Sequence, residues 1–582
     1  MKISQQLRPA SLLLLALTGG ILMGLTPAPV EAWPLGWIAL VPLWFLVGTS
    51  LKGSAQKTKV GQTVTHPPIC DRNIRQPALY GLVWGIGFHG LALFWITGVY
   101  HPMKWMGVPW LAKIGITAFC WTFITLWGAV LVALWAALLV WILNFRFWIS
   151  QKSGLLSLVR VVLGTALWCG LEALWSASPL WWTSLSYTQS PHNLIILHLG
   201  QLSGPSTVTS VIVAVNGLIG EAWLSYSYHL EAKQELKIRR LLAPQNSITS
   251  NIERLNLQSS KEQSVTFAGI ATVLLVVSHL IGFGLYNRPL IQSEAAALNV
   301  GIIQGNIGND IKLFPEGRRL ALERYTDSYL KLVDEGVDAV LTPEGALPFL
   351  MADLKYQSFY SAILEKGVVA WVGAWGERGN SYVNSLLTIT GTGEMHSIYN
   401  KVHVVPLGEY IPFEPILGKF INRLSPLNAS QVGGSPNQIF DTPFGRAIAG
   451  ICYDSAFAEH FQRQAAAGGQ FILTASNNAD YTESMPAQHH AQDVMRAIES
   501  DRWAARATNT GYSGIVDPHG RTVWISGINT YESHADTIYR RQTQTLYVRW
   551  GDWLTKVLLA LSGVVWLFFK TAAHTLTRTT KK

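Results

Sequence analysis

The chain has 582 residues, of which 49% are hydrophobic and 14% are charged, and its mean hydropathy is +0.24. This balance excludes a wholly water-soluble protein, so we predict that part of the chain lies in a membrane. The net charge of +9 is not accompanied by an aromatic-interleaved basic patch or a helix-turn-helix pattern. We attribute the charge to contact with anionic lipid and expect no nucleic-acid partner.

Eight apolar stretches approach or exceed the length of about 20 residues that crosses a hydrocarbon core of about 30 Å. The first also has features of a cleaved signal peptide, but the seven that follow favour a retained helix. The fourth is long enough for one tilted helix or two short ones, and we predict one because no loop-like sequence interrupts it. The stretches are 9–25, 33–49, 77–99, 108–143, 155–177, 206–228, 265–286 and 554–570.

Lysine and arginine gather after the second, fourth, sixth and eighth stretches, whereas the loops between are nearly free of them. By the positive-inside rule, both termini are cytoplasmic and the long segment before the last stretch lies on the outer face. We therefore expect a multi-pass protein of the plasma (inner) membrane. Its domains are a seven-span helical domain at 1–290, an extracytoplasmic catalytic domain at 291–550, and a last transmembrane helix with a basic cytoplasmic tail at 551–582.

The outer segment alternates short apolar runs with polar, helix-capable runs, which is typical of a layered α/β domain. We predict strands at 298–303, 339–342, 368–374, 382–390, 397–401, 446–451 and 471–475. We predict helices at 316–335, 356–366, 456–467 and 487–508, and a hairpin formed by 514–516 and 522–526.

Three ionisable residues follow predicted strands: Glu344, Lys401 and Cys452. Cys452 is the only cysteine after Cys169, so it has no disulfide partner in its own domain. A desolvated glutamate can take a proton from a thiol, and a nearby lysine can stabilise an oxyanion and lower the pKa of the thiol. Singly, these residues have ordinary explanations as a salt-bridging glutamate, a solvated lysine and an inert buried cysteine. Their joint occurrence at strand ends favours a thiol acyl-transfer site.

Four motifs around these residues resemble the nitrilase superfamily. They are Thr342-Pro-Glu-Gly345, Tyr399-Asn-Lys-Val402, Pro406-Leu-Gly-Glu-Tyr-Ile-Pro-Phe413 and Gly450-Ile-Cys-Tyr453. With the eight apolar stretches, the chain resembles the membrane branch of that superfamily, the apolipoprotein N-acyltransferase family, over essentially its whole length. The resemblance implies a polytopic α-helical membrane bundle that carries a nitrilase-like αββα sandwich on the outer leaflet.

The resemblance also implies a ping-pong reaction. A phospholipid acyl chain moves to a cysteine as a thioester, and then to the α-amine of diacylglyceryl-cysteine at the amino terminus of an apolipoprotein. It assigns Glu344 as general base, Lys401 as oxyanion stabiliser and Cys452 as nucleophile, with Glu409 and Tyr453 as supporting residues. We expect no cofactor, no metal and a monomer.

The chain departs from the family pattern at three places. Asp454 stands where the family usually has glutamate. The loop at 311–314 lacks the usual tryptophan, for which Phe314 is the candidate substitute. The segment 476–480 reads Ser-Asn-Asn-Ala-Asp instead of the more usual Ser-Asn-Asp-Ala-Trp.

Other residues have weaker functional interpretations. His489, His490 and Asp493 suggest a metal site, but adjacent histidines on a helix diverge by about 100°, which favours packing roles. Trp181 and Trp182 are typical of an aromatic belt at the membrane interface. A glycine pair four residues apart, at 81 and 85, predicts a close helix contact.

Two other functions remain open at this stage. A membrane-tethered amidase or nitrile hydrolase would use the same three residues with water as acceptor, although eight spans exceed what a tether needs. A channel or transporter would make the spans the functional part, but few charges lie within them.

Overall fold

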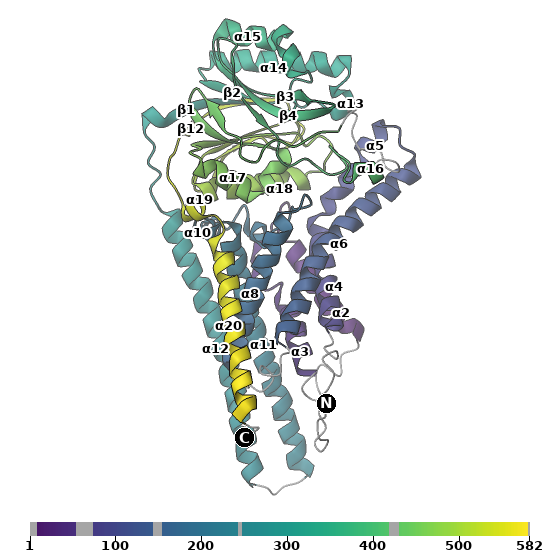
Figure 1. Cartoon of the computed structure of the whole chain (residues 1–582), viewed down its shortest axis with the longest axis vertical. Coiled ribbons are helices and arrows are strands. Elements are labelled where there is room, and N and C mark those ends of the chain that lie inside the picture. The colour runs from purple at the N-terminus through teal and green to yellow at the C-terminus, as the bar shows by residue number, and fades with distance from the viewer. Residues whose placement is uncertain (1–8, 54–73, 144–153, 243–246, 418–429, 580–582) are drawn as a thin grey trace.

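The computed structural model describes residues 9–53, 74–143, 154–242, 247–417 and 430–579. Long helices form the lower part of the molecule in Figure 1, and an α/β domain lies above them. The helices α11 (Pro205–Leu242) and α12 (Ser247–Tyr286) reach farthest from the α/β domain, and α20 (Trp553–Thr579) runs down beside them.

Each apolar stretch predicted from the sequence contains a helix. The prediction of one unbroken helix over the fourth stretch is confirmed by α6 (Trp110–Leu143). Five described helical segments are long and apolar enough to cross a membrane, and a sixth is the bent pair at 75–105, whose halves meet at 54°. The other helices that match predicted stretches are α2 (Pro9–Gly24), α3 (Val41–Gly53), α4 (Arg75–Ala92) and α8 (Gly154–Ser176).

Two of the predicted stretches correspond to short apolar helices, α2 and the apolar part of α20, Trp553–Phe568. Both fall below the length at which composition alone marks a membrane span. Length and hydropathy therefore support up to six spans among the described residues, fewer than the eight expected from the sequence.

The glycine pair on α4 meets α6, as the sequence predicts. A Cβ atom at Gly81 would lie 2.6 Å from the carbonyl oxygen of Val132, and one at Gly85 would lie 2.6 Å from Cα of Ala129. Neither distance leaves room for a methyl group, so these glycines allow the two backbones to approach closely.

The α/β domain contains two six-stranded sheets, with strand orders β12-β1-β2-β3-β4-β5 and β11-β10-β9-β8-β7-β6. Strands β1 to β3 and β7 to β9 run parallel, and the remaining neighbours are antiparallel. The first sheet comprises β1 (Ala297–Gln304), β2 (Ala339–Leu341), β3 (Val369–Arg378), β4 (Ser381–Ile389), β5 (Met395–Asn400) and β12 (Glu532–Tyr539). The second comprises β6 (Phe440–Thr442), β7 (Gly445–Ile451), β8 (Phe471–Ser476), β9 (Ala504–Thr508), β10 (Gly514–Val516) and β11 (Thr522–Ile525).

Three buried apolar clusters hold these sheets in a four-layer αββα sandwich. One fills the space between the two sheets. A second lies between the first sheet and the helices α14 (Pro315–Asp334) and α15 (Ser358–Lys366). A third lies between the second sheet and the helices α17 (Ala458–Ala466) and α18 (Ser484–Ser500). The predicted nitrilase-like sandwich is therefore present.

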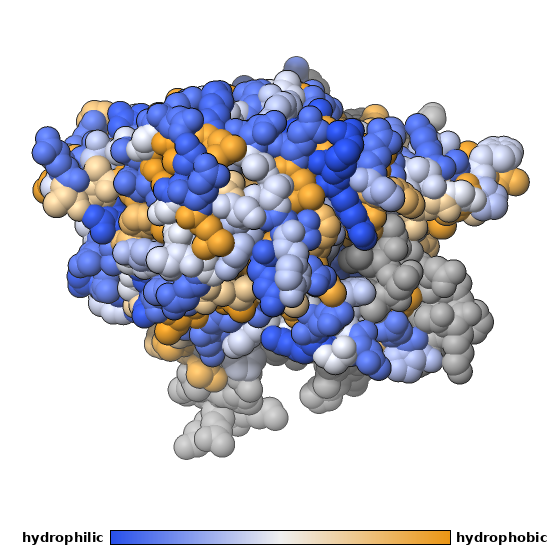
Figure 2. All heavy atoms as spheres, turned by 90° about the horizontal axis from the view of Figure 1, so that it is seen from above, coloured by the Kyte–Doolittle hydropathy of each residue, from blue (hydrophilic) through white to orange (hydrophobic). Residues whose placement is uncertain are grey.

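The α17 and α18 layer faces the long helices, and α14 and α15 lie at the far side (Figure 1). That far side is mostly hydrophilic, with scattered hydrophobic residues (Figure 2). Gln488 of α18 links the α/β domain to the helical part of the chain by hydrogen bonds. Its Nε2 donates to the carbonyl oxygens of Ala28 (3.0 Å) and Ala92 (2.9 Å), and its Oε1 accepts from Nε1 of Trp182 (2.6 Å).

The predicted helix over 487–508 is wrong in its last third. Helix α18 ends at Ser500, where Asp501 turns into the left-handed region with φ of 55°, and the chain continues as β9. Alanine-rich β9 favours a helix by local propensity, but it pairs with β8 and β10 in the middle of the second sheet and is buried along its length. Tertiary packing overrides propensity there.

Besides β9, two strands were not predicted. Strand β6 has only three residues, and β12 is a polar edge strand without the alternation that marks a half-buried strand. The other predicted strands, the three remaining helices and the hairpin are confirmed within a few residues of their expected ends.

Candidate active site

The fold brings together the three residues that follow predicted strands. Glu344 comes three residues after β2, Lys401 directly follows β5, and Cys452 directly follows β7 of the other sheet. Nζ of Lys401 lies 3.0 Å from Oε1 of Glu344. The charges of both residues act on the thiol of Cys452, and all three side chains are buried.

Cys452 occupies a strained position. Its φ is 49°, in the left-handed region that non-glycine residues rarely adopt. It begins the short 3₁₀ turn η6 (Cys452–Ala456), immediately after β7 enters from the core. Such strain persists only where the surroundings fix the backbone, and it is concentrated at functional sites.

Lys401 lies between two carboxylates. Its Nζ donates to Oε1 of Glu344 at 3.0 Å and to Oε1 of Glu409 at 2.6 Å, while Oε2 of Glu409 accepts from the backbone N–H of Val405 at 2.7 Å. Burial lowers the pKa of Lys401, but Glu344 and Glu409 outweigh it and hold that pKa well above its ordinary value. Lys401 is therefore a permanent cation at neutral pH.

Glu344 is held by two residues that the sequence did not single out for this site. Nδ2 of Asn384, on β4, donates to Oε1 of Glu344 at 2.6 Å, and Nζ of Lys312 donates to the backbone carbonyl of Glu344 at 3.1 Å. Both contacts of the carboxylate go to Oε1, and no described residue donates to Oε2. An asparagine in a strand that is mostly buried was the one available signal.

The thiol of Cys452 does not have the lowered pKa expected from the sequence. Burial raises its pKa to about 12, Glu344 and Glu409 raise it too, and Lys401 and Arg506 oppose them. The expectation considered the charge of Lys401, but neither the burial of the thiol nor the negative charge of Glu409. The resting thiol is therefore neutral, and it needs a base at the moment of attack.

Comparisons with known proteins identify the family. Residues 19–218 match the apolipoprotein N-acyltransferase N-terminal domain, and residues 301–538 match the carbon-nitrogen hydrolase family. An apolipoprotein N-acyltransferase from Nostoc sp. is 57% identical over 94% of this chain and 97% of its own length. This chain belongs to the apolipoprotein N-acyltransferase family.

A second member of the family, from Synechocystis sp., is 43% identical over 94% of this chain and 98% of its own length. A solved amidase from Nesterenkonia sp. aligns at 19% identity over 45% of this chain and 95% of that chain, with a TM-score of 0.33. The predicted acyltransferase class is confirmed, and the family favours it over the hydrolase alternative.

The residue that departs from the usual family pattern, Asp454, is fully buried and satisfied. Its Oδ2 accepts from the N–H of Ile451 (3.0 Å) and the hydroxyl of Tyr399 (2.7 Å), and its Oδ1 accepts from the N–H and Nδ1 of His403 (both 2.8 Å). Burial opposes ionisation, but His403 and His460 and these hydrogen bonds hold the pKa of Asp454 well below its usual range. The shorter carboxylate thus ties the segment after Lys401 to the turn at Cys452.

Tyr453 connects the turn at Cys452 to the helical part of this family member. Its hydroxyl donates to the carbonyl oxygens of Pro179 (3.0 Å) and Trp181 (2.7 Å), and its ring stacks on Trp182. Both tryptophans are buried, so their predicted place in an aromatic belt is wrong. They pack under the catalytic domain instead.

The residues weighed as a metal site have packing roles. Within the described ranges, no group of three or more His, Cys, Asp or Glu residues could hold a metal ion. Asp493 forms a buried ion pair with Arg506, which also donates to Oγ of Ser455 at 2.7 Å. The ring of His489 packs against Trp182. Phe314, the candidate substitute for the loop tryptophan, is 55% exposed.

Proposed function

We propose that this protein transfers a fatty acyl chain from a membrane phospholipid, through a thioester on Cys452, to the amino-terminal α-amine of diacylglyceryl-cysteine on apolipoproteins. Relatives with the corresponding name align over nearly the whole chain. The observation that carries the mechanism is the placement of Lys401 Nζ between Glu344 and Glu409. An ammonium group has three N–H donors, and these two contacts leave one free for an oxyanion.

The first half-reaction forms the thioester. Oε2 of Glu344 takes the proton from Sγ as Sγ attacks the ester carbonyl of the phospholipid. The oxyanion that develops accepts the free N–H of Lys401. The ester C–O bond then breaks, and Glu344 returns the proton to the departing glycerol oxygen, which leaves a lysophospholipid.

The second half-reaction uses the same groups in reverse. The acceptor amine attacks the thioester carbonyl, its proton passes to Glu344, and the S–C bond breaks as Sγ is reprotonated. Glu409 keeps Lys401 charged and in place through both steps. Burial of Cys452 limits access of water to the thioester, which favours the amine as acceptor.

The membrane arrangement that we propose has eight spans, with the domain boundaries expected from the sequence. The catalytic domain is contacted by Ala92 at the end of α4, and by Ala28 and Pro179 a few residues beyond the ends of α2 and α8. Helix α20 begins beside the catalytic domain and runs away from it toward the carboxyl end of the chain (Figure 1). The chain thus runs toward the catalytic domain along α2 and away from it along α20. This arrangement supports placing both termini in the cytoplasm and the catalytic domain at the outer face of the plasma membrane.

The test is capture of the thioester. Membranes with the intact protein are incubated with a phospholipid that carries an isotope-labelled acyl chain, and tryptic peptides are analysed by mass spectrometry. We expect a hydroxylamine-sensitive acyl group on the Cys452 peptide, its absence in Cys452→Ser, and its presence in the control Cys120→Ser. Addition of a diacylglyceryl-cysteine peptide should move the label to the peptide amine. Release of the label only as free fatty acid would assign the hydrolase instead.

A further inference from the structure

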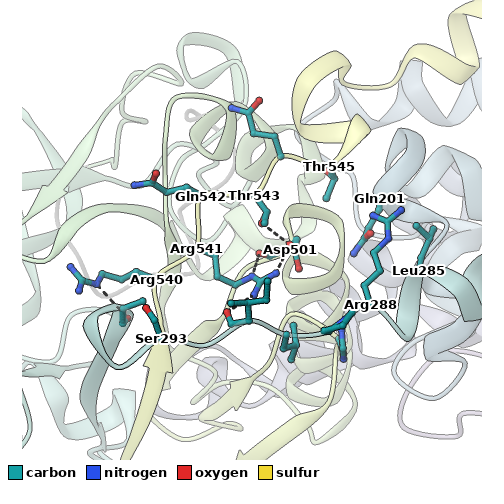
Figure 3. A pocket seen from close by; sticks show the side chains of 16 residues that line it. Gln201, Leu285, Arg288, Ser293, Asp501, Arg540, Arg541, Gln542, Thr543 and Thr545 are labelled. Carbon is teal, nitrogen blue, oxygen red and sulfur yellow. Dashed lines mark hydrogen bonds and ion pairs between the residues drawn. The ribbon is translucent and has the colours of Figure 1, made fainter.

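A cavity lies at the junction of the helices and the catalytic domain, apart from the Cys452 site. Its volume is about 480 Å³, within the range of about 300–1,000 Å³ that is usual for small-molecule sites. Its lining comes from the helix α10 (Gly200–Ser203), the end of α12 and the segment that joins it to β1, the turn at Asp501, the turn between β10 and β11, and the segment that joins β12 to α19 (Leu546–Trp550). Figure 3 shows these segments converging on the cavity.

The lining has an excess of positive charge. It contains three guanidinium groups, on Arg288, Arg540 and Arg541, and one carboxylate, on Asp501. Burial lowers the pKa of His519, the other titratable group of the lining, so its ring is neutral near pH 7. An anion that enters this cavity therefore meets two uncompensated positive charges.

The three arginines are not equivalent. Arg541 is committed to Asp501, with a 2.7 Å contact to Oδ2, and Arg540 donates to backbone carbonyls that include that of Phe444 at 3.1 Å. Figure 3 shows the contact of Arg541 with Asp501, and in that view Arg288 lies on the opposite side of Asp501 from Arg540. No described residue pairs with the guanidinium of Arg288, which makes it the cation available to a ligand.

An apolar surface runs along α12 below the level of the cavity. Val273, Val276, Leu280 and Phe283 are exposed at three- and four-residue spacing, which places them on one face of α12. From Val273 to the end of α12 the helix rises about 20 Å at 1.5 Å per residue, more than the half-thickness of about 15 Å of a hydrocarbon core. Leu285, near the top of this helix and on its other face, lines the cavity itself.

This combination of a cationic cavity above an apolar helix face matches an amphiphile with an anionic head. We propose that the cavity binds the phosphate-containing head group of an anionic phospholipid of the outer leaflet, whose acyl chains lie along α12. The lipid is a bound partner and not the acyl donor, because the lining includes none of the residues around Cys452. The site joins α12 to the segment before α20, so its occupant bridges the last two long helices of the chain.

Native mass spectrometry of the full-length protein in detergent, with Cys452→Ser as the background to prevent turnover, tests this proposal. Phosphatidylglycerol is titrated against phosphatidylcholine, inorganic phosphate and glycerol 3-phosphate. We expect selective binding of phosphatidylglycerol, and roughly five- to tenfold weaker binding in Arg288→Gln, since one arginine near an anionic head group contributes about that factor. Arg288→Lys should keep most of the affinity.

Two further variants separate charge from shape. Arg549→Gln is the matched control, because Arg549 is an exposed arginine at the same level of the molecule that does not line the cavity, and it should bind as the background does. Ser293→Trp should fill the cavity and weaken binding without a change of charge. Equal binding of phosphatidylcholine, or unchanged binding in Arg288→Gln, would overturn the proposal. Equally tight binding of inorganic phosphate would mean that the cavity is a site for a free anion and not for a lipid.

Discussion

Asn384 and Glu344 are joined by a 2.6 Å hydrogen bond from Nδ2 to Oε1. Because Lys401 donates to the same oxygen at 3.0 Å, one face of the carboxylate is fixed and Oε2 is left for proton transfer. If Glu344 is the base that we propose, this amide orients it without touching the reacting atoms, and we expect Asn384 to act as a positioning residue.

Replacement of Asn384 tests that role. In Asn384→Ala we expect thioester formation to slow by roughly 10- to 100-fold, because a hydrogen bond to a charged group contributes about 1.5–3 kcal/mol. The rate should be measured by single-turnover acylation in detergent, with Ser385→Ala as the neighbouring control on β4. A slower rate with an unchanged melting temperature supports positioning, whereas equal losses in both variants would indicate general damage to the strand.

The pH dependence of acylation separates Glu344 from Lys401. In Glu344→Gln the base is lost, and the thiol must ionise unaided, so the rate should rise about tenfold per pH unit below the thiol pKa. That pKa should fall below the value of about 12 found with Glu344 present, because the negative charge that raises it is gone.

Lys401→Ala should show no comparable rescue. Loss of the cation removes oxyanion stabilisation, which costs about 10²–10³-fold in rate, and it leaves the carboxylates free to raise the thiol pKa further. Acylation rates of both variants across the same pH series provide the check. Superimposable profiles would show that the two residues do not have separate roles.

Asp454 should be intolerant of change in both charge and length. Asp454→Asn replaces an acceptor oxygen by a donor nitrogen, leaving buried donors unsatisfied at about 1–3 kcal/mol each. Asp454→Glu adds a methylene to a fully buried site, which typically costs about 1–3 kcal/mol. Thermal unfolding in detergent measures both. An unchanged melting temperature in Asp454→Glu would show that the site accepts the usual residue of the family without repacking.

The low pKa of Asp454 also predicts an acid limit to stability. A carboxyl whose pKa is depressed in the folded state stabilises the fold fully above its ordinary pKa of about 3.9, and that stabilisation is lost as the pH falls toward the folded value. Compared with wild type, Asp454→Asn should therefore lose less stability on going from neutral pH to below about pH 4. Melting temperatures of the two proteins over an acid titration test this directly.

Accessible thiols test the proposed orientation. With the three cysteines at 120, 169 and 452 replaced by serine, Tyr356→Cys places a thiol on an exposed position of the catalytic domain. A membrane-impermeant maleimide should label it in intact spheroplasts, whereas Cys70, which lies outside the described residues, should be labelled only after lysis. The reverse pattern would invert the topology.

Glu344, Lys401 and Cys452 could be predicted from the sequence because the end of a strand is marked by a local pattern. In the sandwich, the ends of β2, β5 and β7 lie close together. Glu409 could be predicted only from the family motif, since its contact with Lys401 spans a loop without regular structure. The contact of Asn384 with Glu344 and the stacking of Tyr453 on Trp182 join residues that are far apart in the chain, so no local sequence pattern predicts them. The error at β9 has the same origin, because alanine-rich Ala504–Thr508 becomes a strand only through its neighbours in the sheet.

Tyr453 is separated from the nucleophile by a single peptide bond, and its hydroxyl is fastened to the segment that follows α8. A change in the tilt of α8 therefore moves the backbone next to Sγ directly. Since the tilt of a membrane helix adjusts to the thickness of the surrounding bilayer, we expect bilayer thickness to influence the rate of acylation, apart from the proposed role of the lipid as acyl donor. Membranes of short-chain and long-chain lipids should support different acylation rates even when the donor is the same.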